Sequence, residues 1–413
     1  MATFANNSIA KTSGYIAKEA ALGFYNNTLL LPAVDRQYSS EFGTVAGGAK
    51  VGSTIRVRCP AQFTTTSSVA LDSSTVQAVV EQTKVLTLSD RTGIHFELST
   101  EQVTLDIESE GSMYSERVLQ PAGKALGAAI ESKGFALATL QAQNTIVVAG
   151  GYTASNMKMN FLNAKALLQK QLAPAGDRWA FVDSNLEVNM VDQQLSFFHA
   201  NEELEKSYKE GTMGTFGGLK WGASDLIAVR TNGAGGTVVT VTSYTEGAET
   251  MVIGGAGAAS VAVGDKLQFA GISLINAQSK QVYYGTPIQR AVKAKVGSTI
   301  TIDPIFSVAT GGSQANASAL PVATDVITVL GIAGKHYACQ LVAQKNGITF
   351  ANADLYIPNN VDMASREKVM DVSIRYIRDY RIGSDDLPSR LEVLHIWALL
   401  RPEWVASVEI QLD

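Results

Sequence analysis

The sequence predicts an α+β protein in which a small β-barrel is inserted into a mixed host. Apolar residues recur at helical spacing in several stretches, most clearly in residues 14–27 and 112–142. Strictly alternating segments lie between and after these stretches, as expected of strands with one solvated face. Residues 224–334 contain only six basic and six acidic residues and consist of short alternating runs separated by glycine turns. This last pattern is typical of a small barrel.

The composition indicates a folded chain with a large apolar core and few charges. Of 413 residues, 46% are hydrophobic and 17% are charged, against about 25% charged in typical soluble proteins. Lys and Arg total 33 and Asp and Glu total 38, so the net charge is −5, whereas a dedicated nucleic-acid binder normally has a basic excess. Cys59 and Cys339 are too few for a disulfide framework and suit a reducing compartment. No apolar run reaches the roughly 18 residues of a membrane span, and no secretory signal is visible, so no membrane partner is expected.

Residues 1–45 are expected to form an N-terminal arm. Ile16, Ala20 and Phe24 recur at a spacing of four, which predicts a short helix with one apolar face. That face can pack on its own domain or on a neighbouring molecule, and both alternatives stay open. Under the second alternative, Ile16 and Phe24 are candidate inter-subunit contacts.

Residues 46–105 predict a projecting hairpin. Residues 54–58 and 76–88 alternate as strands, and the Ser/Thr-rich stretch 61–75 joins them. The two strands are too poor in apolar residues to hold a core of their own, so the hairpin should be mobile alone or held by another molecule. Its candidate contacts with another subunit are Arg56, Arg58, Phe63 and Lys84.

The middle of the chain mixes helices and strands. Residues 112–142 give the longest helical pattern, with Gly123, Gly127 and Gly134 forming a small-residue face that lets another element approach closely. Pro121 should kink this helix or mark its start. Residues 160–172 predict a second helix and residues 178–182 a strand. Ser184 and Glu187 fit a capping box that opens a helix extending to residue 198.

Two turn formulas stand out in the barrel region. Residues 263–267 (Val-Gly-Asp-Lys-Leu) and 296–300 (Val-Gly-Ser-Thr-Ile) each place a glycine where a positive φ is expected. The string AKVGSTI occurs at residues 49–55 and 294–300. We interpret it as the same local sequence leading into a strand at two places, and not as a duplicated domain. Beyond the barrel, strands are predicted over residues 372–380, 390–399 and 404–412.

No residue pattern commits the chain to catalysis, metal binding or cofactor binding. Cys339 follows His336 by three residues, and on a helix the two would meet as nucleophile and base, but a buried structural thiol is the expected reading. The paired acids Asp385–Asp386 and Glu108 with Glu110 resemble those that hydrolases use, yet both lie in Ser/Gly-rich turns, where solvated acids are the default.

One basic and aromatic cluster occurs near the C-terminus. Its members are Arg375, Arg378, Arg381 and Arg390, with Tyr376 and Tyr380 between them. Such a cluster can contact nucleic acid or form ion pairs with acids of a neighbouring subunit. Both alternatives stay open, and Arg375 and Arg378 are the candidate inter-subunit contacts.

Three stretches together resemble the major coat protein family of Salmonella phage P22. Residues 207–213 (Ser-Tyr-Lys-Glu-Gly-Thr-Met), followed by residues 216–220 (Phe-Gly-Gly-Leu-Lys), resemble the segment just before that family's inserted domain. Residues 263–272 (Val-Gly-Asp-Lys-Leu-Gln-Phe-Ala-Gly-Ile) are similar to a run inside the insertion. Arg401-Pro402-Glu403 follows an apolar strand near the C-terminus in both. The three stretches share their order and rough spacing with the family.

The resemblance implies the Hong Kong 97-type capsid fold with an inserted β-barrel domain. Its parts would map onto the chain as the N-terminal arm (1–45), the E-loop hairpin with flanking strands (46–105), the spine helix and peripheral domain (106–145), the axial domain (146–223), the inserted barrel (224–334) and the remainder of the axial and peripheral domains (335–413).

The resemblance also implies a function. Such a coat protein assembles as pentamers and hexamers into an icosahedral procapsid around a scaffolding protein, with a portal protein at one vertex, and the shell expands as double-stranded DNA is packaged. It is not an enzyme and has no cofactor. It belongs to the virion, is assembled in the host bacterial cytoplasm, contacts DNA non-specifically, and usually builds a T=7 shell. In the family, an acidic arm is implicated in binding the scaffolding protein. Residues 14–27 of this chain have no acidic excess, since Lys18 stands beside Glu19. The scaffold contact is therefore expected elsewhere, around Asp35 and Glu41.

Two other functions stay open on the sequence alone. A cellular nanocompartment shell shares the capsid fold, although the inserted barrel favours the phage protein. An enzyme with an unrecognised site would remain a small oligomer on a sizing column, whereas a coat protein should form capsomers, tubes or shells. A covalent crosslink between Lys84 and Asn359 or Asn360 is a minor further alternative.

Overall fold

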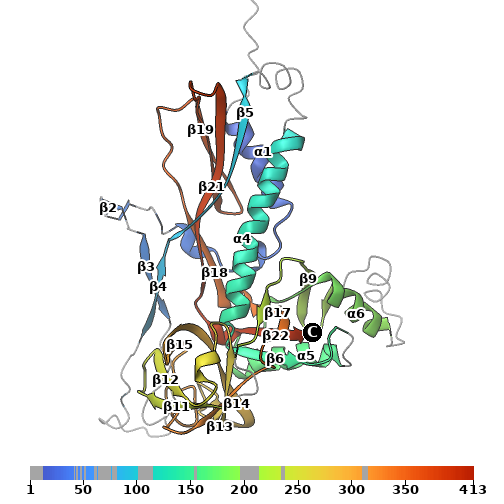
Figure 1. The fold of residues 1–413 in the computed structure, drawn as a ribbon, viewed down its shortest axis with the longest axis vertical. Coiled ribbons are helices and arrows are strands. Elements are labelled where there is room, and N and C mark those ends of the chain that lie inside the picture. Colours follow the sequence, from blue (N-terminus) through green and yellow to red (C-terminus); the bar gives the residue numbers. More distant parts are fainter. Residues whose placement is uncertain are drawn as a thin grey trace, which may run out of the picture.

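The computed structural model describes residues 13–40, 42, 45–46, 49–50, 53–59, 63, 76, 81–100, 115–152, 156–195, 214–233, 238–308 and 315–413. Two mixed layers of helix and sheet and one closed barrel lie along a long central helix (Figure 1). The predicted α+β architecture with a small barrel is therefore confirmed.

A five-stranded sheet and two helices form the upper part of the molecule in Figure 1. The strands are β18 (Ile348–Ala353), β21 (Asp386–Leu399), β20 (Val372–Arg378), β19 (Met363–Val369) and β5 (Asp90–Ser99), the last paired with β21. The helices are α4 (Gln120–Gln141), which covers the sheet, and α1 (Ser13–Tyr25). Trp397 of β21 donates its indole N–H to the carbonyl of Ile130 in α4 at 3.0 Å, which joins the two layers.

The N-terminal helix packs on its own domain. Ala20 and Phe24 of α1 are fully buried against α4 and the adjoining sheet. Gly123 makes the close approach possible, because a Cβ there would lie 2.0 Å from the carbonyl oxygen of Ala20. In the predicted glycine face, Gly123 thus lets α1 approach, whereas Gly134 lies against Trp397 of β21. Pro121 marks the start of α4, directly after a π-helical turn at Ser115–Leu119, while residues 112–114 of the predicted helix lie outside the described residues.

A seven-stranded sheet forms the second layer. Its strands are β6 (Asn144–Val148), β22 (Val405–Gln411), β17 (His336–Gln344), β7 (Arg178–Val182), β9 (Leu219–Ala223), β8 (Thr215–Phe216) and β10 (Val229–Thr231), the last paired with β17. Helices α5 (Met157–Lys170) and α6 (Ser184–Leu195) belong to this layer, and Phe161 and Leu186 are buried in its core. Short 3-10 turns lie at Leu31–Ala33, Gln37–Ser40, Ala258–Ser260, Lys345–Gly347 and Pro402–Trp404.

The cap of α6 lies one residue before the predicted one, and it does not form a capping box, because the residue three positions after Asp183 is Leu186. Asp183 is the cap, because its Oδ1 accepts the N–H of Leu186 at 2.8 Å. The Ser184 hydroxyl instead donates to Asp225 at 2.6 Å. Ser184 was the wrong choice because a neighbouring carboxylate, which accepts more strongly, was available one position earlier. Residues 196–198 of the predicted helix lie outside the described residues.

The inserted barrel is closed and has six strands. In order around the barrel they are β11 (Val239–Tyr244), β12 (Thr250–Gly254), β15 (Thr299–Asp303), β14 (Val282–Val296), β13 (Lys266–Ile275) and β16 (Val326–Val329). The turn formulas are confirmed, since Gly264 and Gly297 have φ of 91° and 61°. The chain leaves the body through β10 and returns through β17, which pair antiparallel, with Thr231 opposite His336.

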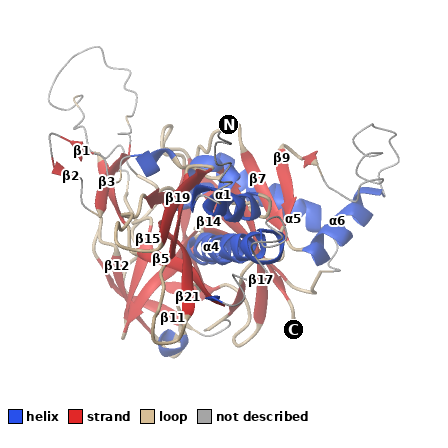
Figure 2. Ribbon diagram, turned by 90° about the horizontal axis from the view of Figure 1, so that it is seen from above, coloured by secondary structure: helices blue, strands red, loops and turns tan. Residues whose placement is uncertain are grey.

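The hairpin strands lie on the side of the molecule opposite α5 and α6, as both views show (Figures 1 and 2). The pairs are β3 (Thr54–Cys59) with β4 (Gln82–Thr87) and β1 (Val45–Ala46) with β2 (Ala49–Lys50). Ile55 and Leu86 share one face, which is buried against Ala351 and Leu400 of the body. The base of the hairpin is therefore held by its own chain. The tip, residues 61–75, lies outside the described residues except for Phe63.

Candidate functional site

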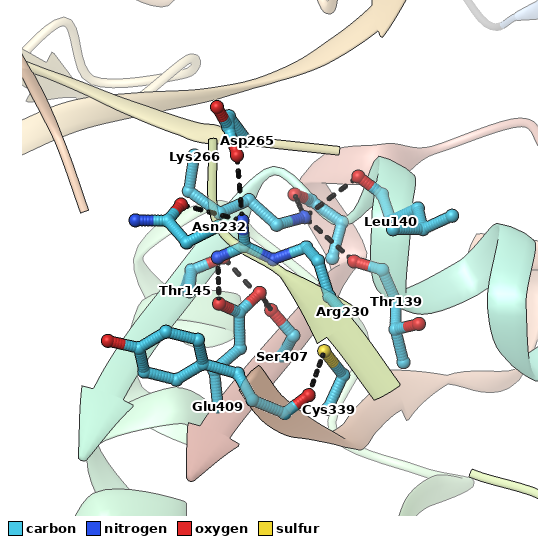
Figure 3. A network of polar contacts seen from close by, with 12 residues as sticks. Thr139, Leu140, Thr145, Arg230, Asn232, Asp265, Lys266, Cys339, Ser407 and Glu409 are labelled. Carbon is cyan, nitrogen blue, oxygen red and sulfur yellow. Dashed lines mark hydrogen bonds and ion pairs between the residues drawn. The ribbon is translucent and has the colours of Figure 1, made fainter. Parts of the chain in front are cut away.

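A buried polar network joins the barrel to the body (Figure 3). Arg230, in β10, has a side chain that is 2% exposed. One of its terminal nitrogens lies 2.9 Å from Oδ1 of Asp265, in the turn before β13. The other donates to Glu409 in β22. A single guanidinium thus bridges a carboxylate of the barrel and a carboxylate of the seven-stranded sheet.

Lys266 connects the barrel to the long helix. Its Nζ atom donates to the carbonyl oxygens of Thr139, Leu140 and Ala142, at 2.7, 2.9 and 3.0 Å. These carbonyls lie at the C-terminal end of α4, where the last oxygens have no partner inside the helix and the helix dipole favours a cation. Burial lowers the pKa of Lys266 to about 8, so it is protonated at neutral pH. A barrel residue therefore caps the central helix.

The network balances its charges. Arg230 and Lys266 supply two cations, and Asp265 and Glu409 supply two carboxylates. The second oxygen of Glu409 accepts the hydroxyl of Ser407 at 3.2 Å. Paired and hydrogen-bonded in this way, the buried charges fix the position of the barrel on the body, since removing any one would leave another uncompensated.

Cys339 and His336 do not form a catalytic pair. They lie on strand β17, where residues three apart project to opposite faces. Burial, followed by the negative charge of Glu409, raises the pKa of Cys339 to about 12. His336 lies at the surface, with Nδ1 3.1 Å from Asp413. The thiol is structural, as the sequence predicted. Of the paired acids, Asp385 lies in a surface turn, as expected. The expectation was wrong for Asp386, which is the first residue of β21, is 5% exposed and accepts the hydroxyl of Ser384 at 2.7 Å. Glu108 and Glu110 lie outside the described residues.

A second contact joins the hairpin to the barrel. The Nζ atom of Lys84 in β4 lies 3.0 and 2.9 Å from the two carboxylate oxygens of Asp303 at the end of β15. Both side chains are about a quarter exposed. Lys84, predicted as a contact with another subunit, thus binds a carboxylate of its own chain in this conformation.

The basic and aromatic cluster also pairs within the chain. Three guanidinium groups surround Glu392, with Nε atoms of Arg91, Arg375 and Arg390 at 2.6, 2.9 and 3.2 Å from its oxygens. Burial acts to raise the pKa of Glu392, but hydrogen bonds from Arg375 and Arg91 offset it and leave the pKa below its usual value. The Arg378 guanidinium binds Asp362. In this conformation the arginines form ion pairs with acids of their own chain.

The remaining candidate contact residues differ in exposure. Phe24 is fully buried, whereas Arg56 and Arg58 are exposed on the hairpin, and Phe63 is 55% exposed. Ile16 lies in α1, and its side chain is outside the described residues. Whether any of the eight candidates touches a neighbouring subunit stays a prediction, and for Phe24 and Arg375 a contact would require another conformation.

Other candidate positions also have a place in the structure. Asp35 is almost wholly buried, and Glu41 is outside the described residues. Asn359 and Asn360 are exposed between β18 and β19. Within the described parts of the chain, no three metal-binding side chains gather in one place. None of the helices there has the length and apolar character to span a membrane.

A family model described as P22 coat protein, gene protein 5, matches residues 1–410. The chain belongs to the P22 coat protein family. It is therefore a phage coat protein, a structural component of the virion and not an enzyme. Family membership carries with it the Hong Kong 97-type capsid fold, and the six-stranded barrel is the insertion that the sequence predicted.

Solved capsid structures are similar to this P22-type coat protein over most of their length. A chain of Mycobacterium phage Che8 is 9% identical with a TM-score of 0.48, covering 92% of this chain and 90% of that one. The capsid of cyanophage P-SCSP1u is 12% identical with a TM-score of 0.44, covering 87% and 83%. The mature capsid of bacteriophage PhiM1 is 9% identical with a TM-score of 0.43, covering 88% and 83%. No curated protein matches the chain. The assignment depends on the family match, not on these structures.

Sequence reasoning missed most of the junction. The turn formula and the resemblance to the P22 family single out Asp265 and Lys266, but neither pattern shows that these two residues hold the barrel. An adjacent acid and lysine in a charge-poor segment is the signal that was available. Arg230 and Glu409 carried no such signal, because their neighbours in the sequence do not show that they are buried.

Proposed function

We propose that this coat protein assembles as pentamers and hexamers into the icosahedral head of a tailed phage, which encloses double-stranded DNA. In this proposal a scaffolding protein directs a procapsid, a portal protein occupies one vertex, and the shell expands on packaging. The family match over residues 1–410 carries the proposal. Assembly takes place in the host cytoplasm, and the T=7 geometry is the usual value for the family.

The hairpin supports a role in contacts between subunits. One face of β3 and β4 packs on the body, while Arg56, Arg58 and Val85 project from the other face and are exposed. We infer that this outward face, together with Phe63, contacts a neighbouring subunit. Each such contact can be weak, because a closed shell repeats it many times and the contacts act together.

The charge of the chain supports a loose contact with DNA. With a net charge of −5, the inner wall of a shell would attract few phosphates, in contrast to a protein that binds nucleic acid as its task. The expansion would be a rotation of rigid parts about their connections. The arm at residues 1–45, the hairpin and the spine helix α4 would be the parts that change their neighbours. The surface around Asp35 remains our candidate for the scaffold contact.

Electron microscopy of the protein expressed with and without its candidate scaffolding protein tests this function. We expect closed shells of uniform size with the scaffold, and irregular shells, tubes or free capsomers without it. A chain that remains a compact monomer or small oligomer at every concentration, with or without the scaffold, would contradict the proposal.

A further inference from the structure

Strand β5 lies at an edge of the five-stranded sheet. It pairs with β21 along one side, and no strand in the described parts of the chain pairs with its other side. The N–H of Thr100 donates to the carbonyl of Asp385 at 3.3 Å, in the register that β5 continues. Because backbone groups alternate along an antiparallel strand, those of the odd-numbered residues from 91 to 97 point away from β21. These residues therefore offer their N–H and C=O groups at an open edge.

The edge lacks the features that usually block an exposed strand. Natural edge strands are commonly protected by short length, by Pro or by a bulge. β5 has ten residues without Pro, and its register with β21 is continuous from Asp90 to Ser99. The side chains on the face away from α4 are exposed at Arg91, His95 and Glu97. A second strand could therefore be added along β5.

Two charges on this strand are incompletely compensated within the chain. Arg91 is 48% exposed and shares Glu392 with two other arginines. Glu97 is 57% exposed, and its contact with Arg381 is 3.6 Å long. A hydrogen bond with Asp386, followed by the charge of that residue, raises the pKa of Glu97. Arg91 thus has spare positive charge, and Glu97 lacks a close cation.

We propose that β5 pairs with β5 of a second copy of this chain, antiparallel about a two-fold axis at Ile94. In this register Arg91 lies opposite the partner's Glu97, and the pair occurs twice because a two-fold contact is self-complementary. His95 lies opposite the partner's Gly93, where the absence of a side chain leaves room for the imidazole. A shift of the register by two residues would remove both pairs of opposite charge.

The same register satisfies the backbone of both strands. It places residue 91 opposite residue 97 and residue 93 opposite residue 95. Each of these residues points its N–H and C=O groups towards the partner, so each pair can exchange both hydrogen bonds. Charge and hydrogen bonding therefore favour one register independently of each other.

The neighbouring helix leaves room for the second copy. Lys133 of α4 donates to the hydroxyl of Thr92 in β5 at 3.0 Å, so this side of α4 faces the strand. Ala129 and Ala136 share that side, because they lie four residues before and three residues after Lys133. Strands are about 4.8 Å apart and packed helices about 8–10 Å apart. With alanines between them, the two copies of α4 can lie side by side over the joined sheet.

A disulfide across the axis tests the register. Opposed residues that do not exchange hydrogen bonds have Cα atoms about 4.5 Å apart, a distance that a disulfide spans. Ile94→Cys is made with Cys59→Ser, since Cys59 is partly exposed while Cys339 is fully buried. Mild oxidation of purified free chains at rising concentration should give mainly a disulfide-linked dimer. Absence of this dimer at every concentration would overturn the proposal.

Thr92→Cys in the same background is the matched control for the disulfide. Thr92 lies on the same face of β5 as Ile94 and is likewise half-buried. In the proposed register its two copies are offset by four residues, about 13 Å along the strand. We expect at least about tenfold less dimer than with Ile94→Cys. Equal crosslinking of the two variants would refute the register.

A charge reversal tests the contact on the surface alone. E97R places an arginine opposite the partner's Arg91 at both ends of the pair, so the dissociation constant of the dimer in sedimentation should rise about tenfold or more. E81R is the matched control, because Glu81 is also exposed and forms a 3.7 Å pair with Arg58. It should change the constant less than about twofold. Equal effects, or a wild-type chain that sediments as a monomer at every concentration, would contradict the contact. Since free chains are measured, the result does not depend on the proposed function.

Discussion

Glu131 of α4 accepts a hydrogen bond from the backbone N–H of Leu30, whose nitrogen lies 2.6 Å from its Oε1 atom. The same oxygen lies 3.1 Å from the nitrogen of Leu31. Glu131 sits in the middle of α4 and is almost wholly buried. It therefore holds the segment that follows the N-terminal helix α1 against α4. Burial raises its pKa to about 7, against the opposing effect of these N–H donors.

This raised pKa predicts that Glu131 contributes most to stability when it is protonated. A carboxyl group with a folded-state pKa of about 7 and an ordinary value of 4.5 loses its contribution as the pH rises between those values, by about 3 kcal/mol in all. E131Q keeps an acceptor for Leu30 and removes this dependence. Urea unfolding at pH 5 and pH 8 should show the variant gaining stability relative to wild type at the higher pH.

The titration of His395 is the reason why the stability of E131Q is compared with that of wild type at each pH. Burial, followed by the charge of Lys133, lowers the pKa of His395 to about 4. Its contribution therefore grows as the pH rises from about 4 towards 6.5 and opposes that of Glu131 in wild type. Because E131Q leaves His395 unchanged, the difference between the two proteins isolates Glu131. Parallel pH profiles for wild type and E131Q would refute the prediction.

The contact of α1 with α4 predicts a sharp difference between two glycines of the same helix. A Cβ at Gly123 would lie 2.0 Å from the backbone oxygen of Ala20, whereas at Gly127 it would lie 3.3 Å from a methyl group of Thr28. Both G123A and G127A gain helix propensity, about 1 kcal/mol. G123A should nevertheless destabilise by about 3 kcal/mol or more by displacing α1, while G127A should be near neutral. Thermal unfolding and limited proteolysis of α1 measure this, and similar results for both variants would contradict it.

The capping of α4 by the barrel predicts that Lys266 is needed for docking. K266M leaves three helix carbonyls without their donor and leaves Arg230 facing two carboxylates, Asp265 and Glu409. We expect a loss of about 2 kcal/mol or more in urea unfolding and faster hydrogen exchange at the end of α4. K293M, at an exposed lysine of the same barrel, is the control and should change neither. Unaltered exchange at residues 139–142 in K266M would exclude the capping role.

The ion pair between Lys84 and Asp303 predicts a local effect. Because the pair is partly solvated, it contributes at most about 1 kcal/mol, so K84M should leave global stability almost unchanged. Hydrogen exchange in β3 and β4 should rise up to about fivefold. E81Q, which breaks the 3.7 Å pair with Arg58 inside the hairpin, is the matched control and should leave contact with the barrel intact. Restoration of slow exchange by the swap K84D with D303K would complete the test, and failure of the swap would count against a charge effect.

Local pattern was enough to predict the elements of this fold. The strand predicted over residues 178–182 has those bounds in the structure, and the helix predicted over residues 14–27 spans Ser13–Tyr25. The positive φ of Gly264 followed from the turn formula alone. These features depend on residues close together in the sequence, where spacing and steric limits decide the conformation.

Pairings between distant elements could not be predicted in the same way. Lys266 and the carbonyl of Thr139 in α4 are 127 residues apart, and Glu131 and Leu30 are 101 residues apart. Periodicity shows which face of a helix is buried but not which element covers it. The same limit applied to Arg375, because the register that places it opposite Glu392 is set by the whole sheet. The cluster therefore suggested partners outside the chain, although Glu392, the partner of Arg375, lies on the next strand and Asp362, the partner of Arg378, lies directly before β19.

The barrel enters and leaves the body at adjacent points, since Thr231 of β10 is opposite His336 of β17. A tight turn could join these two positions, but it would take Lys266 away from the end of α4 and Asp265 away from Arg230. An unrelated domain whose ends lie a strand's width apart could be grafted there to display cargo on a particle. Such a graft would have to supply its own cation for the end of α4 and its own acid for Arg230, because the natural insert brings both with it.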